Sequence, residues 1–532
     1  MRRSLLVLAL PFALLAAACN TDDGPVATGS NDNSATVTTE AGAGSTTAGT
    51  EPVDTDPSTE PTVASTDPSA TGVPMPDSSA AFGWAEFGQG VETGSLEVPI
   101  DYTDPSKGTI DLYVSRHLAA DPTKRIGSLL VNPGGPGFGG SDFAVYAEQI
   151  YSETLLEHFD IVGWDPRGTG LSEPAIDCVD DYDLYFAGTD ITPEDQAERQ
   201  ELIDLADEFQ TACATKNADV LQYIGTNNSA RDMDAIREAL QEPAISYFGF
   251  SYGSELGATW ATLFPDTVRA AVLDGAADPN ADFLESGLQQ TAGFEKSIAT
   301  FLARCSDDSD CAFNNGGDAE GAFDALMAGV DEQPIPSEPD RADVTRAMAL
   351  TGVAQAMYSE SFWPELEQAL ADGQSGDGSG LLALYDSYYQ RQPDGTYDNS
   401  LEAFQTISCM DEEERLTVEQ DDATAADYTA IAPRFAPGTT GTYFCTFYPE
   451  ATDPRVAVTG AGAGPILVVG TTGDPATPLS STENMAKALE QGVLLVVVAD
   501  QHTGYGVNQC SYDTIDGYLV ELTVPDDGVR CE

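Results

Sequence analysis

Six short apolar runs that end in small or polar residues constrain the fold of this chain most strongly. They are SLLVNPGG from Ser128, FDIVGWD from Phe159, ISYFGFS from Ile245, RAAVLDG from Arg269, PILVVGTTGD from Pro465 and LLVVVADQH from Leu494. Runs that are apolar throughout are typical of buried parallel strands. The segments ARDMDAIREALQ and SELGATWATLF, which lie between such runs, carry apolar residues at helical spacing. This alternation predicts a doubly wound α/β fold with a mostly parallel sheet, whose ligands bind at the carboxyl ends of the strands.

Two segments interrupt the alternation and predict insertions. Residues 173–226 are acidic and have a helical pattern, and residues 279–462 contain helical stretches such as VTRAMALTGVAQAMY. The second insertion falls where loops cross the strand ends, so we expect a mainly helical cap over the ligand pocket. The core is then expected over residues 81–278 and 463–532, starting with a hairpin formed by GSLEVPIDY and GTIDLYVSRHL.

The first 80 residues are expected to lie outside the globular part. Residues 1–18 have the pattern of a signal peptide, with Arg2 and Arg3 before an apolar stretch and an A-x-A site that ends at Ala18. Cys19 follows directly and resembles the cysteine that is lipidated in bacterial lipoproteins. Residues 19–80, rich in Thr, Ser, Ala, Asp and Pro, predict a disordered linker. We therefore expect an exported protein on the outer face of the cell membrane, with plain secretion as the alternative.

The cysteines favour the same compartment. Of nine cysteines, eight remain when Cys19 is set aside, and in an oxidising compartment they predict four disulfides. Eight cysteines allow 105 pairings, and sequential pairing is our choice because each pair then lies within one local segment. The predicted pairs are Cys178–Cys213, Cys305–Cys311, Cys409–Cys445 and Cys510–Cys531. The chain has no C-x-x-C and its three histidines are scattered, so we expect no metal and no other cofactor.

The net charge of −66 narrows the possible partners. Nucleic-acid binding depends on Lys and Arg that neutralise phosphates, so nucleic acid is not an expected partner. The same charge argues against binding to an anionic lipid surface through basic patches, which leaves a lipid at Cys19 as the expected membrane contact. A high negative charge favours solubility, and we expect a monomer.

Ser251 stands in the sequence GFSYG, between an apolar run and a helical segment. A strand, a G-x-S-x-G turn and a helix in this order form an elbow that lifts the serine hydroxyl above the sheet, where it can act as a nucleophile. The alternative is a serine that caps the helix N-terminus. The surrounding strand and helix favour the nucleophile.

A serine nucleophile requires a base, and the chain offers three histidines. His117 and His158 precede the serine, whereas the elbow architecture has the order serine, acid, histidine. His502 alone satisfies that order. Asp474, at the end of PILVVGTTGD, is our choice for the acid, and Asp278 is the second choice. Asp474 could instead cap the turn that follows it.

The stretch LLVNPGGPGFGGS predicts donors for the oxyanion of an acyl transfer. Its glycines let bare backbone approach a substrate, and the N–H groups of Gly135 and Tyr252 would form the oxyanion hole. A phosphate-binding loop is the alternative, but the stretch lacks G-K-[ST].

Taken together, these motifs resemble the α/β-hydrolase fold and, more narrowly, the secreted tripeptidyl aminopeptidases of the proline iminopeptidase-like serine peptidases. The matching pieces are NPGGPG at Asn132, FDIVGWDPRGTGLS at Phe159, ARDMDAIREAL at Ala230, YFGFSYGSELGATWATLFPDTVRAAVLDG at Tyr247, ISCMD at Ile407, PILVVGTTGDPATP at Pro465 and HTGYG at His502 with Cys510. The resemblance implies Ser251 as nucleophile, Asp474 as acid, His502 as base and a pocket under a lid. It also implies the release of short peptides from a free N-terminus.

An aminopeptidase must bind a cationic substrate N-terminus, for which a carboxylate is the natural partner. Glu255, one turn after the nucleophile, and Asp411 and Glu412 in the sequence CMDEEER are the candidates. The alternative for each is a solvated surface carboxylate. Our expectation is an exported serine aminopeptidase that releases di- or tripeptides. An esterase or amidase with the same triad and a non-catalytic surface protein are the alternatives.

Overall fold

The computed structural model of this chain describes residues 72–73, 75–187, 191–193 and 195–532. The predicted signal peptide, Cys19 and nearly all of the predicted linker lie outside the described residues. Within the described part of the chain, no helix combines the length and apolar character that a membrane span requires.

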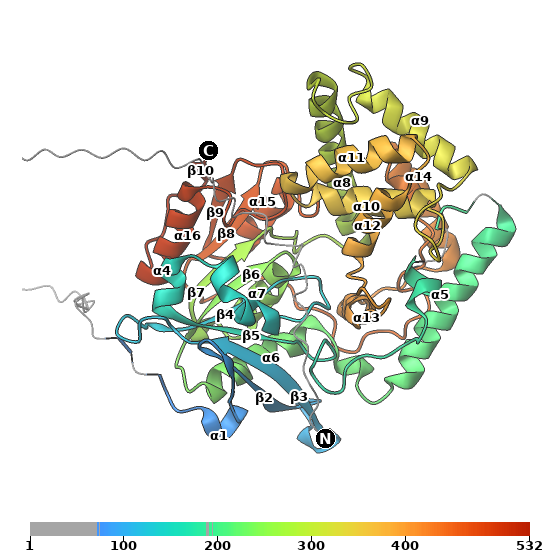
Figure 1. Cartoon of the computed structure of the whole chain (residues 1–532). Coiled ribbons are helices and arrows are strands. Elements are labelled where there is room, and N and C mark those ends of the chain that lie inside the picture. Colours follow the sequence, from blue (N-terminus) through green and yellow to red (C-terminus); the bar gives the residue numbers. More distant parts are fainter. Residues whose placement is uncertain (1–71, 74, 188–190, 194) are drawn as a thin grey trace, which may run out of the picture. The chain divides into compact units, whose positions relative to one another are not determined.

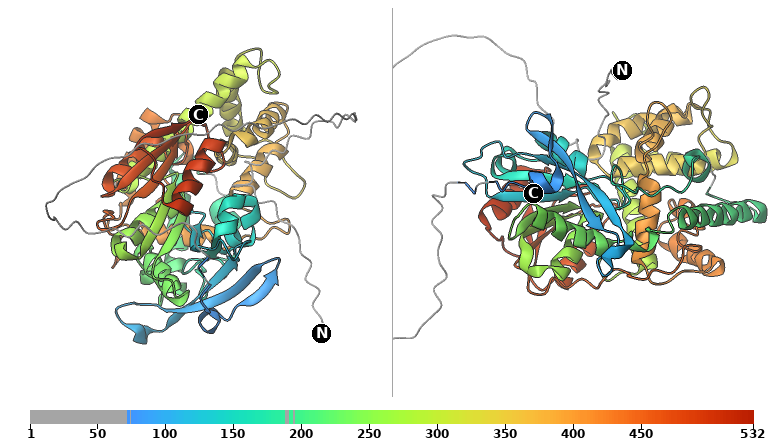
Figure 2. Two further views of the ribbon diagram at one scale, coloured as in Figure 1. Left: turned by 90° about the vertical axis from the view of Figure 1, so that its left-hand side faces the viewer. Right: turned by 90° about the horizontal axis from the view of Figure 1, so that it is seen from below.

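A ten-stranded sheet, ordered β1-β2-β3-β5-β4-β6-β7-β8-β9-β10, organises the fold (Figure 1). The strands are β1 (Ala85–Gly88), β2 (Val91–Pro99), β3 (Thr109–His117), β4 (Gly127–Asn132), β5 (Phe159–Trp164), β6 (Ile245–Phe250), β7 (Val268–Asp274), β8 (Ile466–Thr471), β9 (Gly492–Val497) and β10 (Val529–Cys531). All pairs from β5 to β10 are parallel, and β1, β2 and β3 are antiparallel to their neighbours. The predicted mostly parallel sheet and the predicted hairpin are therefore confirmed. In the left view of Figure 2 the blue hairpin β2–β3 lies at the edge away from the red strands.

Helices cover both faces of the sheet, as a doubly wound fold requires. The helices of the core are α1 (Ser79–Phe82), α2 (Ser141–Val145), α3 (Ala147–Ile150), α4 (Glu153–His158), α6 (Thr226–Ala239), α7 (Tyr252–Leu263), α15 (Leu479–Ala488) and α16 (Gln509–Glu521). Leu130 of β4 belongs to the apolar cluster that contains α6 and α7, whereas its neighbour Leu129 belongs to the cluster that contains α4 and α16. Successive residues of a central strand thus enter two different cores because strand side chains alternate between the faces.

The segment between β7 and β8 is a helical insertion with its own apolar core (Figure 1). It contains α8 (Phe283–Asp307), α9 (Ala319–Glu332), α10 (Arg346–Met357), α11 (Trp363–Gln374), α12 (Ser379–Tyr388), α13 (Ser400–Asp411) and α14 (Val418–Ile431). The earlier acidic segment supplies α5 (Gln196–Lys216). A long insertion can hold itself together in this way because Phe301, Leu350 and Leu366 bury their side chains among its own helices.

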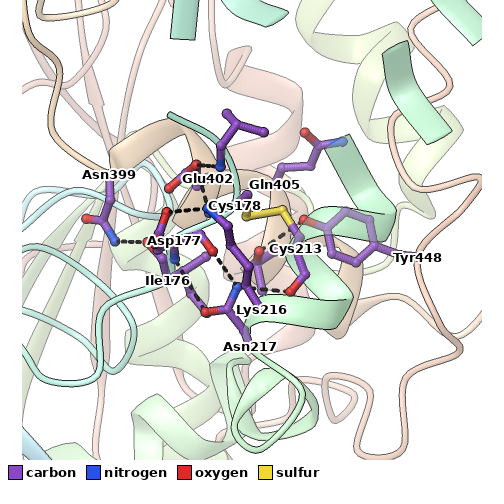
Figure 3. The surroundings of a disulfide bond; sticks show 12 residues. Ile176, Asp177, Cys178, Cys213, Lys216, Asn217, Asn399, Glu402, Gln405 and Tyr448 are labelled. Carbon is purple, nitrogen blue, oxygen red and sulfur yellow. Dashed lines mark hydrogen bonds and ion pairs between the residues drawn. A yellow bond between two sulfur atoms is a disulfide. The ribbon is translucent and has the colours of Figure 1, made fainter. Parts of the chain in front are cut away.

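Four disulfides join Cys178–Cys213, Cys305–Cys311, Cys409–Cys445 and Cys510–Cys531, which are the sequential pairs. Figure 3 shows the surroundings of the first. Glu402 of α13 accepts hydrogen bonds from the backbone N–H groups of Cys178 (2.9 Å) and Val179 (2.8 Å). The helix α13 is therefore fixed to the segment that carries this disulfide.

Candidate active site

Ser251 lies at the turn between the fully buried strand β6 and the helix α7. Its backbone has φ 55° and ψ −126°, an uncommon conformation for a residue other than glycine and typical of a nucleophile elbow. A Cβ atom on Gly249 would lie 2.3 Å from the carbonyl oxygen of Gly253, and one on Gly253 would lie 3.0 Å from the carbonyl oxygen of Asn132, so both positions favour glycine. The Ser251 hydroxyl forms no cap hydrogen bond, so the helix-cap alternative is not what the structure contains.

His502 is paired with Asp474. The His502 Nδ1 atom lies 2.9 Å from each carboxylate oxygen of Asp474, and the carboxylate also accepts the N–H groups of Ala476 (3.0 Å) and Thr477 (2.8 Å). Asp474 thus caps its turn and orients the imidazole at the same time. The second-choice acid, Asp278, instead accepts a hydrogen bond from Asn484 (2.6 Å).

The other ring nitrogen of His502 is available to accept a proton. Its Nε2 atom is buried and has no hydrogen-bond partner within the described part of the chain. Burial alone would lower the pKa of His502, but the charge and the hydrogen bond of Asp474 outweigh it, so the pKa is raised above its ordinary value. The helical insertion contacts this ring, because Tyr358 packs edge-on against it at 5.6 Å and accepts the His502 backbone N–H at 2.9 Å. An imidazole held in this way can accept a proton at Nε2.

Ser251 and His502 both lie against the end of β7. The Ser251 N–H donates to the carbonyl oxygen of Asp274 at 2.8 Å. A Cβ atom on the next residue, Gly275, would lie 2.9 Å from His502 Cε1, so the imidazole packs directly on this backbone. The other two histidines belong to different elements, His117 to β3 and His158 to the end of α4.

The glycine-rich loop after β4 packs against the elbow. Gly134 and Gly135 have φ of 106° and 105°. A Cβ atom on Gly134 would lie 2.6 Å from the carbonyl oxygen of Phe250, 2.8 Å from Ser251 Cβ and 3.2 Å from the nitrogen of Tyr252. The two residues predicted to supply oxyanion donors, Gly135 and Tyr252, therefore come from segments that touch each other.

The three carboxylates proposed for the substrate amine have different surroundings. Glu255 forms an ion pair with Arg455. The sequence suggests either an ammonium-binding or a solvated carboxylate, and neither prediction includes this arginine. Asp411 is buried and accepts hydrogen bonds from the N–H (2.7 Å) and hydroxyl (2.5 Å) of Thr226. Burial raises the pKa of Asp411 to about 7.

Glu412 has charged groups of both signs nearby. It is half-buried, and its carboxylate forms no hydrogen bond with any described residue. Burial raises the pKa of Glu412 and the nearby charge of Asp282 raises it further, whereas the charge of Arg415 lowers it. Asp282 is the residue that precedes α8, and its carboxylate accepts the N–H of Glu285 at 2.8 Å.

Sequence reasoning missed Tyr358, Thr477 and Asp274. Tyr358 follows α10 in the insertion, and nothing in the sequence connects it with His502. Thr477 lies three residues after the acid, and its hydroxyl is 3.3 Å from His502 Nδ1. Asp274 ends the apolar run RAAVLDG, where an acid on a buried strand could have been noticed.

Comparisons with known proteins agree with this geometry. Residues 127–314 match the family model described as alpha/beta hydrolase fold, and residues 435–531 match the model described as TAP-like protein. The chain is 35% identical over 466 residues to the serine protease Hip1 of Mycobacterium tuberculosis, covering 83% of this chain and 87% of the relative. It is 35% identical over 466 residues to carboxylesterase B of the same species, covering 82% and 85%. It is 28% identical over 460 residues to the tripeptidyl aminopeptidase of Streptomyces lividans, covering 81% of each.

Proposed function

Because this chain belongs to the TAP-like family of α/β-hydrolase serine peptidases, we propose that it releases tripeptides from the free N-terminus of oligopeptides. The observation that carries the catalytic part is the His502 imidazole, held by Asp474 at Nδ1 and unpartnered at its buried Nε2. The similarity to a tripeptidyl aminopeptidase supports the mode of cleavage.

In the proposed mechanism, the Ser251 hydroxyl attacks the carbonyl carbon of the scissile peptide bond while His502 Nε2 accepts its proton. The imidazolium that forms is stabilised by Asp474. The N–H groups of Gly135 and Tyr252 stabilise the negative charge on the former carbonyl oxygen. The imidazolium then gives its proton to the leaving amine, and a water molecule activated by His502 hydrolyses the acyl-enzyme.

Glu412 is our choice for the carboxylate that binds the substrate ammonium. Arg455 already neutralises Glu255, and Thr226 occupies Asp411. The Glu412 carboxylate accepts no hydrogen bond from a described residue, because the nearby Arg415 guanidinium donates to backbone carbonyl oxygens instead. A carboxylate without a hydrogen-bonded partner can accept a charge-assisted hydrogen bond from an ammonium group.

The position of Glu412 also supports a fixed product length. In the second turn of α13, the backbone of Phe404 packs on the glycine-rich loop, because a Cβ atom on Gly137 would lie 2.5 Å from the Phe404 nitrogen. Eight residues of helix separate Phe404 from Glu412, which is a rise of about 12 Å. Three extended residues span about 10 Å, so an ammonium at Glu412 would leave the third peptide carbonyl near the oxyanion loop.

A series of peptide anilides tests this proposal. We expect turnover of tripeptide anilides with a free N-terminus and loss of turnover on N-acetylation. Glu412→Gln should raise KM for the free tripeptide about 10- to 100-fold, the range for a charge-assisted contact of about 1.5–3 kcal/mol. Glu413→Gln, one residue away on an exposed side chain, is the matched control and should leave KM unchanged. Equal turnover of acetylated and free substrates would refute the aminopeptidase, while Glu412→Gln without effect would refute only the assigned carboxylate.

An esterase is the second candidate, favoured by the 35% identity to carboxylesterase B. A triad does not by itself select an ester or an amide, so nitrophenyl esters of short acyl chains are the appropriate comparison. Turnover of these esters without any turnover of free-N-terminus anilides would favour this second function. We expect both to be cleaved, with the tripeptide anilide showing the higher kcat/KM.

We also propose that the protein is exported and attached to the membrane by a lipid on Cys19. The four disulfides are consistent with an oxidising compartment. Metabolic labelling with an alkyne fatty acid should mark the wild-type chain and not Cys19→Ser, which should be released into the medium. An unlabelled wild-type chain in the medium would favour plain secretion.

A further inference from the structure

Asp274 is a buried carboxylate that contacts both halves of the proposed catalytic machinery. It is the last residue of β7 and is fully buried. Its carbonyl oxygen accepts the N–H of Ser251 at 2.8 Å. Its carboxylate oxygens accept the N–H of Gly504 at 2.7 Å and the N–H of Tyr505 at 2.8 Å, two and three residues after the general base. A single residue thus connects the nucleophile elbow with the loop between β9 and α16 that carries His502, here called the histidine loop.

We propose that Asp274 is a positioning residue that fixes the separation between Ser251 and His502. This inference rests on the triad proposed above. The elbow is fixed from one side through the Asp274 backbone, and the histidine loop is fixed from the other through its side chain. The backbone at Asp274 is itself held in place, because the N–H of the adjacent Gly275 donates to the carbonyl oxygen of Val469 in β8 at 2.9 Å.

The chemistry of the contact requires a carboxylate. Both Asp274 oxygens receive main-chain N–H groups, so both must be acceptors. An asparagine of nearly the same shape has one acceptor oxygen and one NH₂ group, and the NH₂ group would face an N–H donor. A buried donor without an acceptor is unfavourable, so the loop is expected to move away from the altered side chain. A displacement near 1 Å between reacting groups lowers turnover about 10²-fold.

Asp516 provides a matched control because it is another buried carboxylate, in α16, that contacts Tyr505 of the same loop. It accepts a hydrogen bond from the Tyr505 hydroxyl at 3.0 Å and from the Ser152 hydroxyl at 2.5 Å. It contacts no backbone N–H of residues 502–505 among the described hydrogen bonds. Asp516→Asn therefore removes a buried charge beside Tyr505 without releasing the backbone that follows His502.

The first test compares Asp274→Asn and Asp516→Asn in the full chain. For Asp274→Asn we expect kcat on a tripeptide anilide to fall about 10²-fold with KM within threefold, and Ser251 labelling by a fluorophosphonate to slow by a similar factor. Asp516→Asn should keep kcat within threefold. In ¹⁵N-histidine spectra, which contain three residues, the His502 ring signals should shift in Asp274→Asn and stay in place in Asp516→Asn. A purely structural role would lower the melting temperature of both variants without changing kcat or the His502 signals.

The outcomes separate this inference from the proposed function. If wild-type Ser251 is not labelled, the triad fails. If the wild-type serine is labelled and folded Asp274→Asn is labelled at the same rate, only the role of Asp274 is overturned. Should Asp274→Asn fail to fold, hydrogen exchange of the wild-type protein decides. The amides of Gly504 and Tyr505 should exchange about as slowly as those of the central strands, and rapid exchange of both would overturn the inference.

Discussion

Gly134→Ala tests whether the glycine-rich loop must touch the nucleophile elbow. The new methyl group would lie 2.6 Å from the Phe250 carbonyl oxygen and 2.8 Å from Ser251 Cβ, whereas ordinary contact begins at 3.4 Å. Because the first of these atoms belongs to the backbone of β6, it cannot turn away. The loop must therefore retreat by roughly 0.8 Å, the gap between those contact distances.

The expected loss of activity follows from that displacement. A shift close to 1 Å in a catalytic group lowers the rate about 10²-fold, and the loss of one oxyanion donor lowers kcat about 10²- to 10³-fold. We expect kcat for a tripeptide anilide to fall by about 10²-fold or more. The backbone also contributes, since φ at Gly134 is 106° and an alanine in a left-handed conformation is destabilised by about 1–2 kcal/mol.

Gly376→Ala separates the two effects. Gly376 has φ of 90°, and a Cβ atom there would meet nothing within 4 Å. This control should lower the free energy of unfolding by about 1–2 kcal/mol and leave kcat unchanged. The assay measures kcat with the anilide and stability by urea unfolding for both variants. Gly134→Ala with more than half of the wild-type kcat would refute the contact between this loop and the oxyanion site.

Three further predictions concern pH and the disulfides. The pKa of His502 is raised by Asp474, so the acid limb of kcat/KM should lie above the ordinary histidine value of about 6.5 and move to lower pH in Asp474→Asn; a wild-type limb well below 6.5 would contradict this. The pKa of Asp411 rises from 3.8 to about 7 on burial, so its contribution to stability is complete below about pH 4 and lost as pH rises through 7. Calorimetry should therefore give a higher melting temperature at pH 5 than at pH 7.5. A lower melting temperature at pH 5 would contradict the raised pKa of the buried Asp411. Replacing Cys178 and Cys213 by serine, which opens a link across 35 residues, should lower the free energy of unfolding by about 4 kcal/mol in urea titrations, and a loss under 1 kcal/mol would show that this link constrains the unfolded chain little.

The fold could be predicted because its signals are local. Each buried parallel strand is a continuous apolar run, and each ends at the polar or glycine residues of the ligand-binding edge. The run from Ile245 into GFSYG shows both features and leads directly into α7. Sequential disulfides could be predicted for the same reason, since each pair lies within one segment.

Contacts across the chain could not be predicted in the same way. Arg455 neutralises Glu255 from 200 residues away, and Thr226 holds Asp411 from the start of α6. Both depend on how the helical insertion packs against the core, and apolar periodicity contains no information about that packing. For this reason the sequence supplied three candidate carboxylates for one amine. Only the contacts in the structure favour Glu412, whose carboxylate accepts no hydrogen bond from a described residue.

The central claim is that Ser251 is the nucleophile activated by His502. Peptide mapping by mass spectrometry after treatment with a fluorophosphonate tests it most directly. We expect one covalent adduct on the peptide that contains Ser251, no adduct in Ser251→Ala, and labelling that is strongly slowed in His502→Ala. An adduct on another serine, or a wild-type protein that stays unmodified while folded, would contradict the account.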